Sequence, residues 1–235
     1  MMEFTLEQRE KMRQTKKFKL TNQIWNDEHF NSQKYVGCTN YLIKSFFQNT
    51  DLSDVDNKNI NEWHKYYTTT KNEDIRKSGR DEKELSKLAR EFKNKCKEYG
   101  LNITLNEAYN YIIIRVIDDT YRGFLKELEA AKYISSTIWP GSTVRTTGTE
   151  DIDYNVDLVV SYGDEIIDAY QIKPYSFLYG VQQQKQYCKK ALDENLVGHK
   201  KYEEKYGIKP VFLIYTGNNN NYIYIDNFKD IRGCN

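Results

Sequence analysis

Three side chains in the C-terminal half have types and spacing suited to one reaction: Asp157, Gln171 and Lys173. They lie in two short runs rich in β-branched and aromatic residues, joined by a turn that contains glycine, so the runs are predicted to form a β-hairpin. If residues 163–165 make a three-residue loop, Asp157 falls opposite Gln171. Because side chains alternate along a strand, all three are then expected on one face of the hairpin.

A carboxylate, an amide and an ammonium group together suit phosphodiester hydrolysis. A hard cation such as Mg²⁺ takes oxygen ligands, and the attacking water needs help in losing a proton. We expect Asp157 and the side-chain oxygen of Gln171 to hold Mg²⁺, with the Ile172 carbonyl as a further ligand. Lys173 would orient the water and stabilise charge on the phosphate. The alternative is a hairpin on which Asp157 and Lys173 form only a surface pair.

A further acid is expected from a helix packed under the sheet. That helix carries an apolar stripe at helical spacing, formed by Phe124, Leu128, Ala131 and Ile134. Glu127 falls inside the stripe, whereas Glu129 falls towards the polar side. A carboxylate on a core-facing stripe is costly unless it is paired or bound to metal, so Glu127 is the candidate ligand. The alternative is a Glu at the edge of the stripe that reaches solvent.

Acids also crowd the entry to the Asp157 strand. Glu150, Asp151 and Asp153 precede it, and any of them could be an additional or substitute ligand. Asp153 has the same parity as Asp157 and is therefore the preferred reserve. The alternative is that these acids are solvated loop residues.

A helix is predicted over residues 181–196, and its first turns are rich in amides. Gln183, Gln184 and Lys185 are candidates for contacts with DNA phosphates. Gln184 follows Val181 by three residues, so we expect it to face inward. A plain polar surface is the alternative.

The elements that position these groups follow from local patterning. A short helix is predicted to start at a capping box at 5–8, and a second helix is predicted over 81–99 with Gly100 as its C-cap. A third helix is predicted from a capping box at 104–107 to about 134, with a possible break at Gly123. Strands are predicted over 144–147, 156–162, 166–173, 211–216 and 222–225. The order indicates an α/β fold with a central sheet flanked by helices. We assign residues 1–103 to a helical recognition or dimerisation arm and 104–235 to the core.

Composition excludes several classes of protein. The opening segment mixes acids and bases without an apolar core, so neither a signal peptide nor a membrane span is expected and the predicted location is the cytoplasm. The four cysteines, Cys38, Cys96, Cys188 and Cys234, lack the spacing of a zinc site or a disulfide framework. The three histidines fit no catalytic triad, and no phosphate-binding loop of the Walker type occurs.

The formal net charge of +1 does not by itself indicate a nucleic-acid-binding protein. Basic residues are nevertheless gathered in two runs. One spans residues 9–19, and the other spans residues 76–97, where basic side chains outnumber acidic ones. Each run, taken alone, is equally compatible with a solvated helix face and with a DNA-binding surface.

Taken together, these residues resemble a known superfamily. Gly-x-x-x-Glu on a helix, Val-Asp at a strand start and Gln-x-Lys closing the next strand resemble the PD-(D/E)xK nuclease core in its Gln-x-Lys variant, over residues 123–216. The segments at 19–25, 120–123 and 172–175 are most similar to MjaI-like type II restriction endonucleases. This resemblance implies a restriction-endonuclease-like core and a Mg²⁺-dependent homodimer. Its substrate would be double-stranded DNA cut at a short palindrome, CTAG in the namesake.

This chain departs from the superfamily pattern at two positions. No proline precedes Asp157, and Gln171 replaces the usual acid. One fewer negative charge then holds the metal, so we expect a single firmly held Mg²⁺ beside Lys173.

Two rival functions are carried forward. One is a non-catalytic DNA-binding protein on the same fold, and the other is a nuclease directed by DNA structure or modification. The presence of Glu127, Asp157 and Lys173 together favours an enzyme, because a protein that only binds DNA would not need all three. The long helical N-terminal half favours recognition of sequence.

Overall fold

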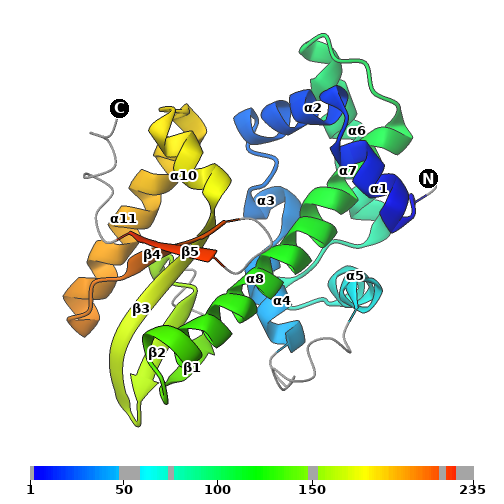
Figure 1. The fold of residues 1–235 in the computed structure, drawn as a ribbon. Helices are drawn as coiled ribbons and strands as arrows, with labels where there is room; N and C mark the ends of the chain where they lie inside the picture. Colours follow the sequence, from blue (N-terminus) through cyan, green and yellow to red (C-terminus); the bar gives the residue numbers. More distant parts are fainter. Residues whose placement is uncertain (1–2, 48–58, 74–76, 148–152, 217–220, 226–235) are drawn as a thin grey trace. The chain divides into compact units, whose positions relative to one another are not determined.

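The computed structural model describes residues 3–47, 59–73, 77–147, 153–216 and 221–225 (Figure 1). The chain forms two compact units, Met1–Phe124 and Leu125–Asn235, which we call unit 1 and unit 2. Their boundary falls inside helix α8 (Asp119–Tyr133). Residues 104–124, grouped with the core in the sequence analysis, belong to unit 1.

Unit 1 is helical in its described part. Its helices before residue 114 are α1 (Leu6–Arg13), α2 (Lys16–Asp27), α3 (Gln33–Val36), α4 (Thr39–Phe47), α5 (Ile60–Thr69), α6 (Glu82–Glu98) and α7 (Leu105–Ile113). The capping boxes predicted at Thr5 and Thr104 start α1 and α7, and Asp81 caps α6 in the same way. Gly100 takes a left-handed φ of 73° just beyond α6, as predicted.

The helix predicted from 104 to 134 is irregular, but not at Gly123. A π-helical turn, η3 (Ile114–Asp118), joins α7 to α8, and a second one, η4 (Ile134–Ile138), follows α8. Gly123 lies within α8. The irregularity therefore falls at Asp118, a fully buried acid that lies in the first π-helical turn.

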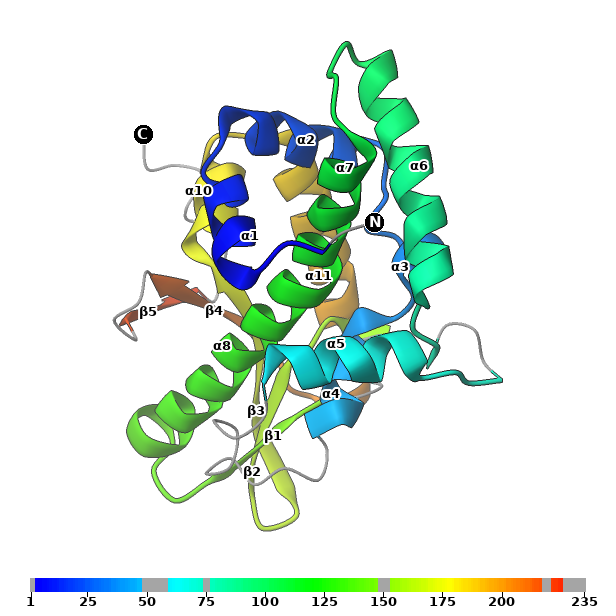
Figure 2. The ribbon, with the colours of Figure 1, turned by 90° about the vertical axis from the view of Figure 1, so that its right-hand side faces the viewer.

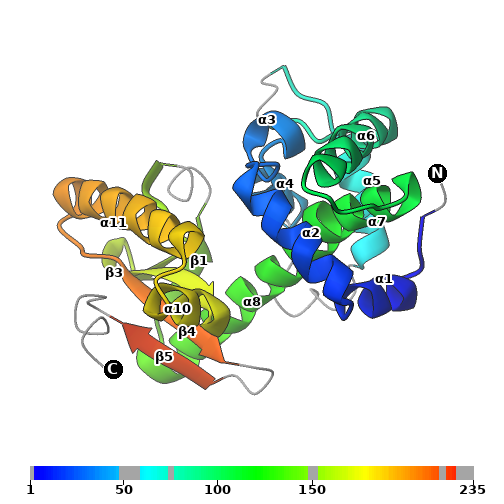
Figure 3. The same cartoon turned by 90° about the horizontal axis from the view of Figure 1, so that it is seen from above.

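Aromatic rings hold the helices of unit 1 together. Tyr111 of α7 stacks on Phe92 of α6 with 5.0 Å between ring centroids, and Trp25 of α2 meets both rings. Figure 3 shows α1, α2, α6 and α7 gathered in this unit. These contacts between rings are the reason that α7 belongs with unit 1.

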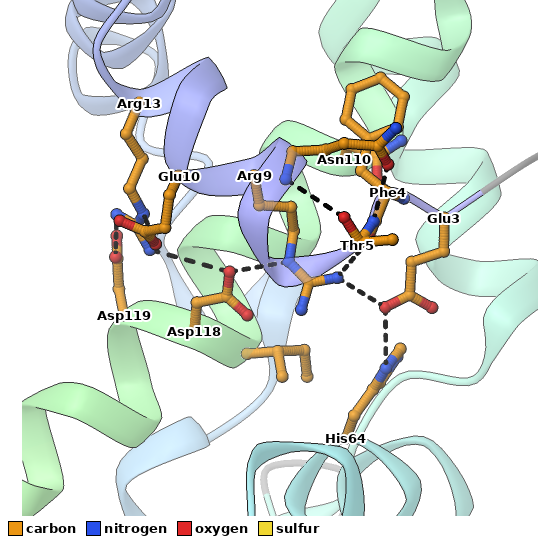
Figure 4. Close-up of polar contacts among 12 residues, drawn as sticks. Glu3, Phe4, Thr5, Arg9, Glu10, Arg13, His64, Asn110, Asp118 and Asp119 are labelled. Atoms are coloured by element: carbon orange, nitrogen blue, oxygen red, sulfur yellow. Dashed lines mark hydrogen bonds and ion pairs between the residues drawn. The ribbon is translucent and has the colours of Figure 1, made fainter.

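A polar cluster ties the N-terminal helix to η3 (Figure 4). Arg9 is only 3% exposed, and its Nε donates to Asp118 Oδ2 at 2.9 Å. The same guanidinium pairs with Glu3 through Nη1, and Arg13 pairs with Asp119 at 2.6 Å. Burial raises the pKa of Asp118, and the charge of Arg9 acts in the opposite direction.

Unit 2 is built on the expected mixed sheet of five strands in the order β1-β2-β3-β4-β5 (Figure 1). The strands are β1 (Thr143–Thr146), β2 (Leu158–Tyr162), β3 (Glu165–Pro174), β4 (Val211–Thr216) and β5 (Asn221–Ile225). Strands β3 and β4 are parallel, and the other neighbours are antiparallel. The fold is thus the predicted α/β class, with a central mixed sheet and flanking helices.

The turn between β2 and β3 is one residue shorter than predicted. Tyr162 pairs with Glu165, so only residues 163–164 make the turn. A β-bulge inside the hairpin then shifts the pairing by one residue, after which Leu158 pairs with Tyr170. That final register equals the one that the longer loop would have produced, so the prediction that Asp157 falls opposite Gln171 survives an error in the turn.

The two faces of the sheet are covered by different helices (Figure 1), and Figure 2 gives the view turned by 90°. One face packs against α8 and η4 through Ala130, Ala131, Ile134, Leu158, Val160, Tyr170, Ile172, Val211 and Leu213. The other face packs against α10 (Tyr175–Gln182) and α11 (Gln186–Tyr206) through Val159, Ala169, Phe177, Leu178, Leu192, Tyr202, Phe212 and Ile214. The single helix predicted over 181–196 is therefore wrong, since two helices with a break between them occupy this region.

Candidate active site

Asp157 and Gln171 lie in direct contact under the face covered by α10 and α11. Asp157 immediately precedes β2, and its Oδ2 accepts hydrogen bonds from Gln171 Nε2 and from the backbone N–H of Ile172, the latter at 2.8 Å. Asp157 is 4% exposed and Gln171 is 2% exposed. A buried carboxylate is costly unless hydrogen bonds compensate it, and these two N–H donors do so.

Lys173 follows Gln171 by two residues on β3 and therefore has the same orientation relative to the sheet. It pairs in register with Ile214 of β4, whereas Gln171 pairs with Phe212. Both of these β4 residues belong to the apolar cluster under α10 and α11. The structure thus brings the half-buried Lys173 to the same side of the sheet as Asp157 and Gln171.

The oxygen atoms at this position fit a hard cation. Gln171 Oε1 is buried and has no hydrogen-bond partner among the described residues. A buried oxygen without a donor favours a cation or a water molecule beside it. With the Asp157 carboxylate it forms a donor set of the kind that Mg²⁺ takes. In the described part of the chain, no group of three or more His, Cys, Asp and Glu side chains could hold a metal ion, so the set depends on an amide.

Glu127 lies on α8, the helix that covers the opposite face of the sheet. It precedes Ala130 and Ala131 of α8 by about one turn, and those two residues pack on Tyr170 and Ile172. Its Oε2 is a buried atom, in keeping with the expected inward orientation. The structure does not place Glu127 on the face that carries Asp157, and its role as a ligand stays a prediction.

Of the three acids that precede the Asp157 strand, the structure describes only Asp153. Asp153 is exposed, four residues before the buried Asp157. Glu150 and Asp151 lie outside the described residues. The preference for Asp153 as a substitute ligand therefore stays a prediction.

The amide-rich segment differs from its predicted structure. Gln183, Gln184 and Lys185 form the break between α10 and α11, and all three are exposed. Gln184 takes a left-handed φ of 52°, so the expectation that it faces inward from a helix is wrong. The Lys185 ammonium lies 5.5 Å from the centre of the Tyr179 ring. These exposed side chains remain candidates for contacts with DNA.

His199 is a residue of this region that the sequence analysis missed. It lies on α11, and its ring centroid is 4.8 Å from that of Phe212, the β4 partner of Gln171. Its Nε2 lies 3.1 Å from the carbonyl oxygen of Asn155, two residues before Asp157. No local pattern marks His199, because its neighbours in space come from β4 and from the segment that leads into β2.

Burial lowers the pKa of His199 to about 4, and the positive charge of Lys173 acts in the same direction. The contact with the Asn155 carbonyl acts in the opposite direction. His199 is therefore neutral at pH 7, and the effect of the Lys173 charge on its pKa indicates that the two side chains are close enough to interact.

Gly198 allows α11 to approach the backbone that leads to Asp157. A Cβ atom at this position would lie 2.5 Å from the carbonyl oxygen of Tyr154 and 2.6 Å from Asn155 Nδ2. The Asn155 amide also donates to the Glu194 carbonyl at 3.3 Å. Asn155 itself takes a left-handed φ of 55°, which directs the chain from this contact into the strand. Helix α11 thus fixes the position from which Asp157 enters the site.

Comparison with known families identifies the family to which this chain belongs. The family model described as MjaI restriction endonuclease matches residues 19–230, which include helices of unit 1 and all five strands of unit 2. The chain belongs to the MjaI restriction endonuclease family. Membership implies a restriction endonuclease, that is, a nuclease that binds DNA. No curated protein and no solved structure matches the chain significantly.

The match spans parts of both units of this MjaI-family chain. The candidate residues Glu127, Asp157, Gln171 and Lys173 lie within the matched span, as does His199. The buried Arg9 lies before it. The family assignment therefore rests on the sheet, its covering helices and most of unit 1.

Two further expectations for this endonuclease can be compared with its structure. No helix in the described ranges has the length and apolar character needed to span a membrane. Cys38, Cys96 and Cys188 form no disulfide among the described residues, and Cys234 lies outside them.

Proposed function

We propose that this chain is a type II restriction endonuclease with a PD-(D/E)xK-type site. It hydrolyses phosphodiester bonds of double-stranded DNA at a short palindrome, in a Mg²⁺-dependent reaction. The observation that carries this proposal is the contact of Asp157 with Gln171 on the sheet face that also carries Lys173, beside a buried Gln171 oxygen that lacks a donor. An enzyme with this substrate would act in the cytoplasm.

Each side chain has a distinct role in this reaction. Asp157 and Gln171 Oε1 hold the cation, and Glu127 is a further candidate ligand. When bound there, Mg²⁺ would supply Lewis-acid chemistry at the phosphate. Lys173 orients the attacking water and stabilises the negative charge that develops on the phosphate oxygens. His199, neutral at pH 7, adds no positive charge beside Lys173 and keeps α11 against the segment that positions Asp157.

The palindrome implies a two-fold symmetric enzyme, because each subunit then reads one half of the site. We therefore propose a homodimer, with CTAG as the first sequence to test because of the family resemblance. The amide-rich break at 183–185 is exposed and follows the strand that carries Lys173, so it is a candidate for phosphate contacts.

Cleavage of plasmid DNA in the presence of Mg²⁺ tests the proposal. The wild-type chain should yield discrete fragments, and sequencing their ends gives the recognition sequence and the stagger. Lys173→Ala and Asp157→Asn should each lower the cleavage rate by at least about 100-fold while DNA binding persists. Asp153→Asn, at an exposed acid four residues earlier, is the matched control and should leave cleavage near the wild-type rate.

Two results would contradict the proposal. Binding without cleavage in both Mg²⁺ and Mn²⁺ would indicate a non-catalytic DNA-binding protein. Fragments with random ends, or cuts only at branched or modified DNA, would indicate a nuclease directed by structure or modification. If Asp153→Asn abolished cleavage and Asp157→Asn did not, the ligand assignment would be wrong.

A further inference from the structure

Helix α6 separates its buried side from a side of mostly basic residues. Its buried residues are Leu85, Leu88, Ala89, Phe92 and Cys96. The basic residues on the other side are Lys83, Lys87, Arg90, Lys93 and Lys97, which we call the α6 basic face. They follow one another at spacings of three or four residues, so they line one side of the helix. All are exposed except Lys93, which is half-buried.

The α6 basic face has no acidic partner in the part of the chain that the structure describes. None of its five side chains forms an ion pair there. The neighbouring acids of α6 are engaged elsewhere: Glu84 pairs with Lys71 at 2.8 Å, and Glu98 pairs with Lys95 at 2.8 Å. Glu91 lies at the edge of the face. The cations of this face are therefore available to an external partner.

A second surface helix provides an internal reference. On α11, Lys190 lies 4.0 Å from Glu194, and Lys200 lies 3.7 Å from Glu204, both at a spacing of four residues. Such alternation is the usual arrangement on a solvated helix. The α6 basic face instead places like charges at the spacing where α11 places opposite ones.

This arrangement has an energetic cost within the helix. Like charges at a spacing of four residues destabilise a helix. Lys83 with Lys87 and Lys93 with Lys97 are two such pairs, and Arg90 lies between them. A polyanion bound along the face would remove this repulsion, because its negative charges would lie between the cations.

We propose that the α6 basic face binds the phosphate backbone of duplex DNA. This inference rests on the proposed function and adds to it a contact surface in unit 1, separate from the cleavage residues of unit 2. From Lys83 to Lys97 the face runs for about 21 Å, at 1.5 Å per residue of helix. That length corresponds to roughly six base steps of one strand at 3.4 Å per step. Phosphate contacts of this kind position the enzyme without reading sequence.

Salt dependence of DNA binding tests this assignment. The cleavage-deficient Lys173→Ala chain is titrated onto a fluorescent duplex at 50–200 mM KCl, and the slope of log Kobs against log salt is measured. Adding Lys87→Gln and Arg90→Gln should reduce the magnitude of this negative slope by about 1.8, since each lost phosphate contact removes roughly 0.9. The matched control adds Lys200→Gln and Lys201→Gln, which remove the same charge from exposed positions of α11 and should leave the slope unchanged.

Each outcome is decisive. A slope unchanged by Lys87→Gln and Arg90→Gln, or reduced equally by the α11 control, would overturn the α6 basic face as a DNA contact. In that case cleavage by the otherwise wild-type chain would still support the proposed function. If the chain neither binds nor cuts DNA, the proposed function and this inference fail together. Thermal unfolding of the variants at a temperature no lower than that of the Lys173→Ala chain shows that the substitutions act on binding.

Discussion

Two basic runs that are equivalent in sequence have opposite arrangements in the fold. In the run at 9–19, Arg9 is buried against Asp118, Arg13 pairs with Asp119 and Lys17 pairs with Glu107 at 2.7 Å. The α6 basic face has no such partner among the described residues. The difference teaches that the number of lysines and arginines in a segment does not indicate its use. What decides is whether the fold brings acids to them.

The largest effect on stability is expected at Arg9, the buried residue of the run at 9–19. Arg9→Gln should lower the free energy of unfolding by about 3–5 kcal/mol, because the buried Asp118 then loses its nearest charged partner and keeps the more distant Arg13, at 3.9 Å. Urea unfolding at pH 7 measures the change. Lys11→Gln, in the same run but with a side chain 74% exposed, should cost less than about 0.5 kcal/mol. Equal effects of the two substitutions would show that burial does not distinguish them.

His199 extends the comparison to a basic group that is buried without an acid. Its pKa is lowered by burial to about 4 in the folded chain, whereas an unfolded histidine titrates near about 6.5. The unfolded state therefore binds more protons between these pH values, so stability is complete above about pH 6.5 and falls as the pH decreases towards 4. We expect a total loss of about 3 kcal/mol in urea unfolding over this window.

His199→Gln should reduce that pH dependence and provides the control. Its absolute stability at pH 7 can differ from the wild type, so the comparison uses the slope against pH. A slope that stays at the wild-type value in His199→Gln would assign the pH dependence to other groups.

The smallest expected effect is a gain in stability at the α6 basic face, opposite in sign to the loss expected at Arg9. Lys87→Gln with Arg90→Gln should raise the free energy of unfolding by a few tenths of a kcal/mol at low salt, because like charges are removed. The gain should vanish at 1 M salt, where screening acts over about 3 Å. Neutralising Arg9 lowers stability and neutralising this pair raises it, and urea unfolding at two salt concentrations measures both. A loss of stability at low salt would show that the face is stabilised by partners within the chain.

Local periodicity predicted much of unit 2. Strand β4 was placed at its observed bounds, and the shared orientation of Asp157, Gln171 and Lys173 followed from the alternation of side chains. The capping boxes at Thr5 and Thr104 were also correct, because capping depends on residues three apart in the chain. Signals of this kind involve neighbours in sequence.

Backbone geometry that lacks a glycine or proline signal was not predictable. The break at 183–185 depends on a left-handed backbone conformation at Gln184, and glutamine is not a residue type that predicts such a conformation. The bulge in the hairpin and the π-helical turn at 114–118 are likewise set by packing. The family resemblance correctly named the fold but gave no reason to consider His199, which reaches the site through contacts between α11, β4 and Asn155.

The bulge in the β2–β3 hairpin separates the turn from the end of the strands that carries the candidate site. The turn at 163–164 has one register, and the pairing of Leu158 with Tyr170 has another, so the two ends of the hairpin are set independently. A change of length at the tip can be absorbed before it reaches Asp157 and Gln171. The tip is thus the part of the sheet where a label or an inserted peptide would leave the geometry of Asp157 and Gln171 intact.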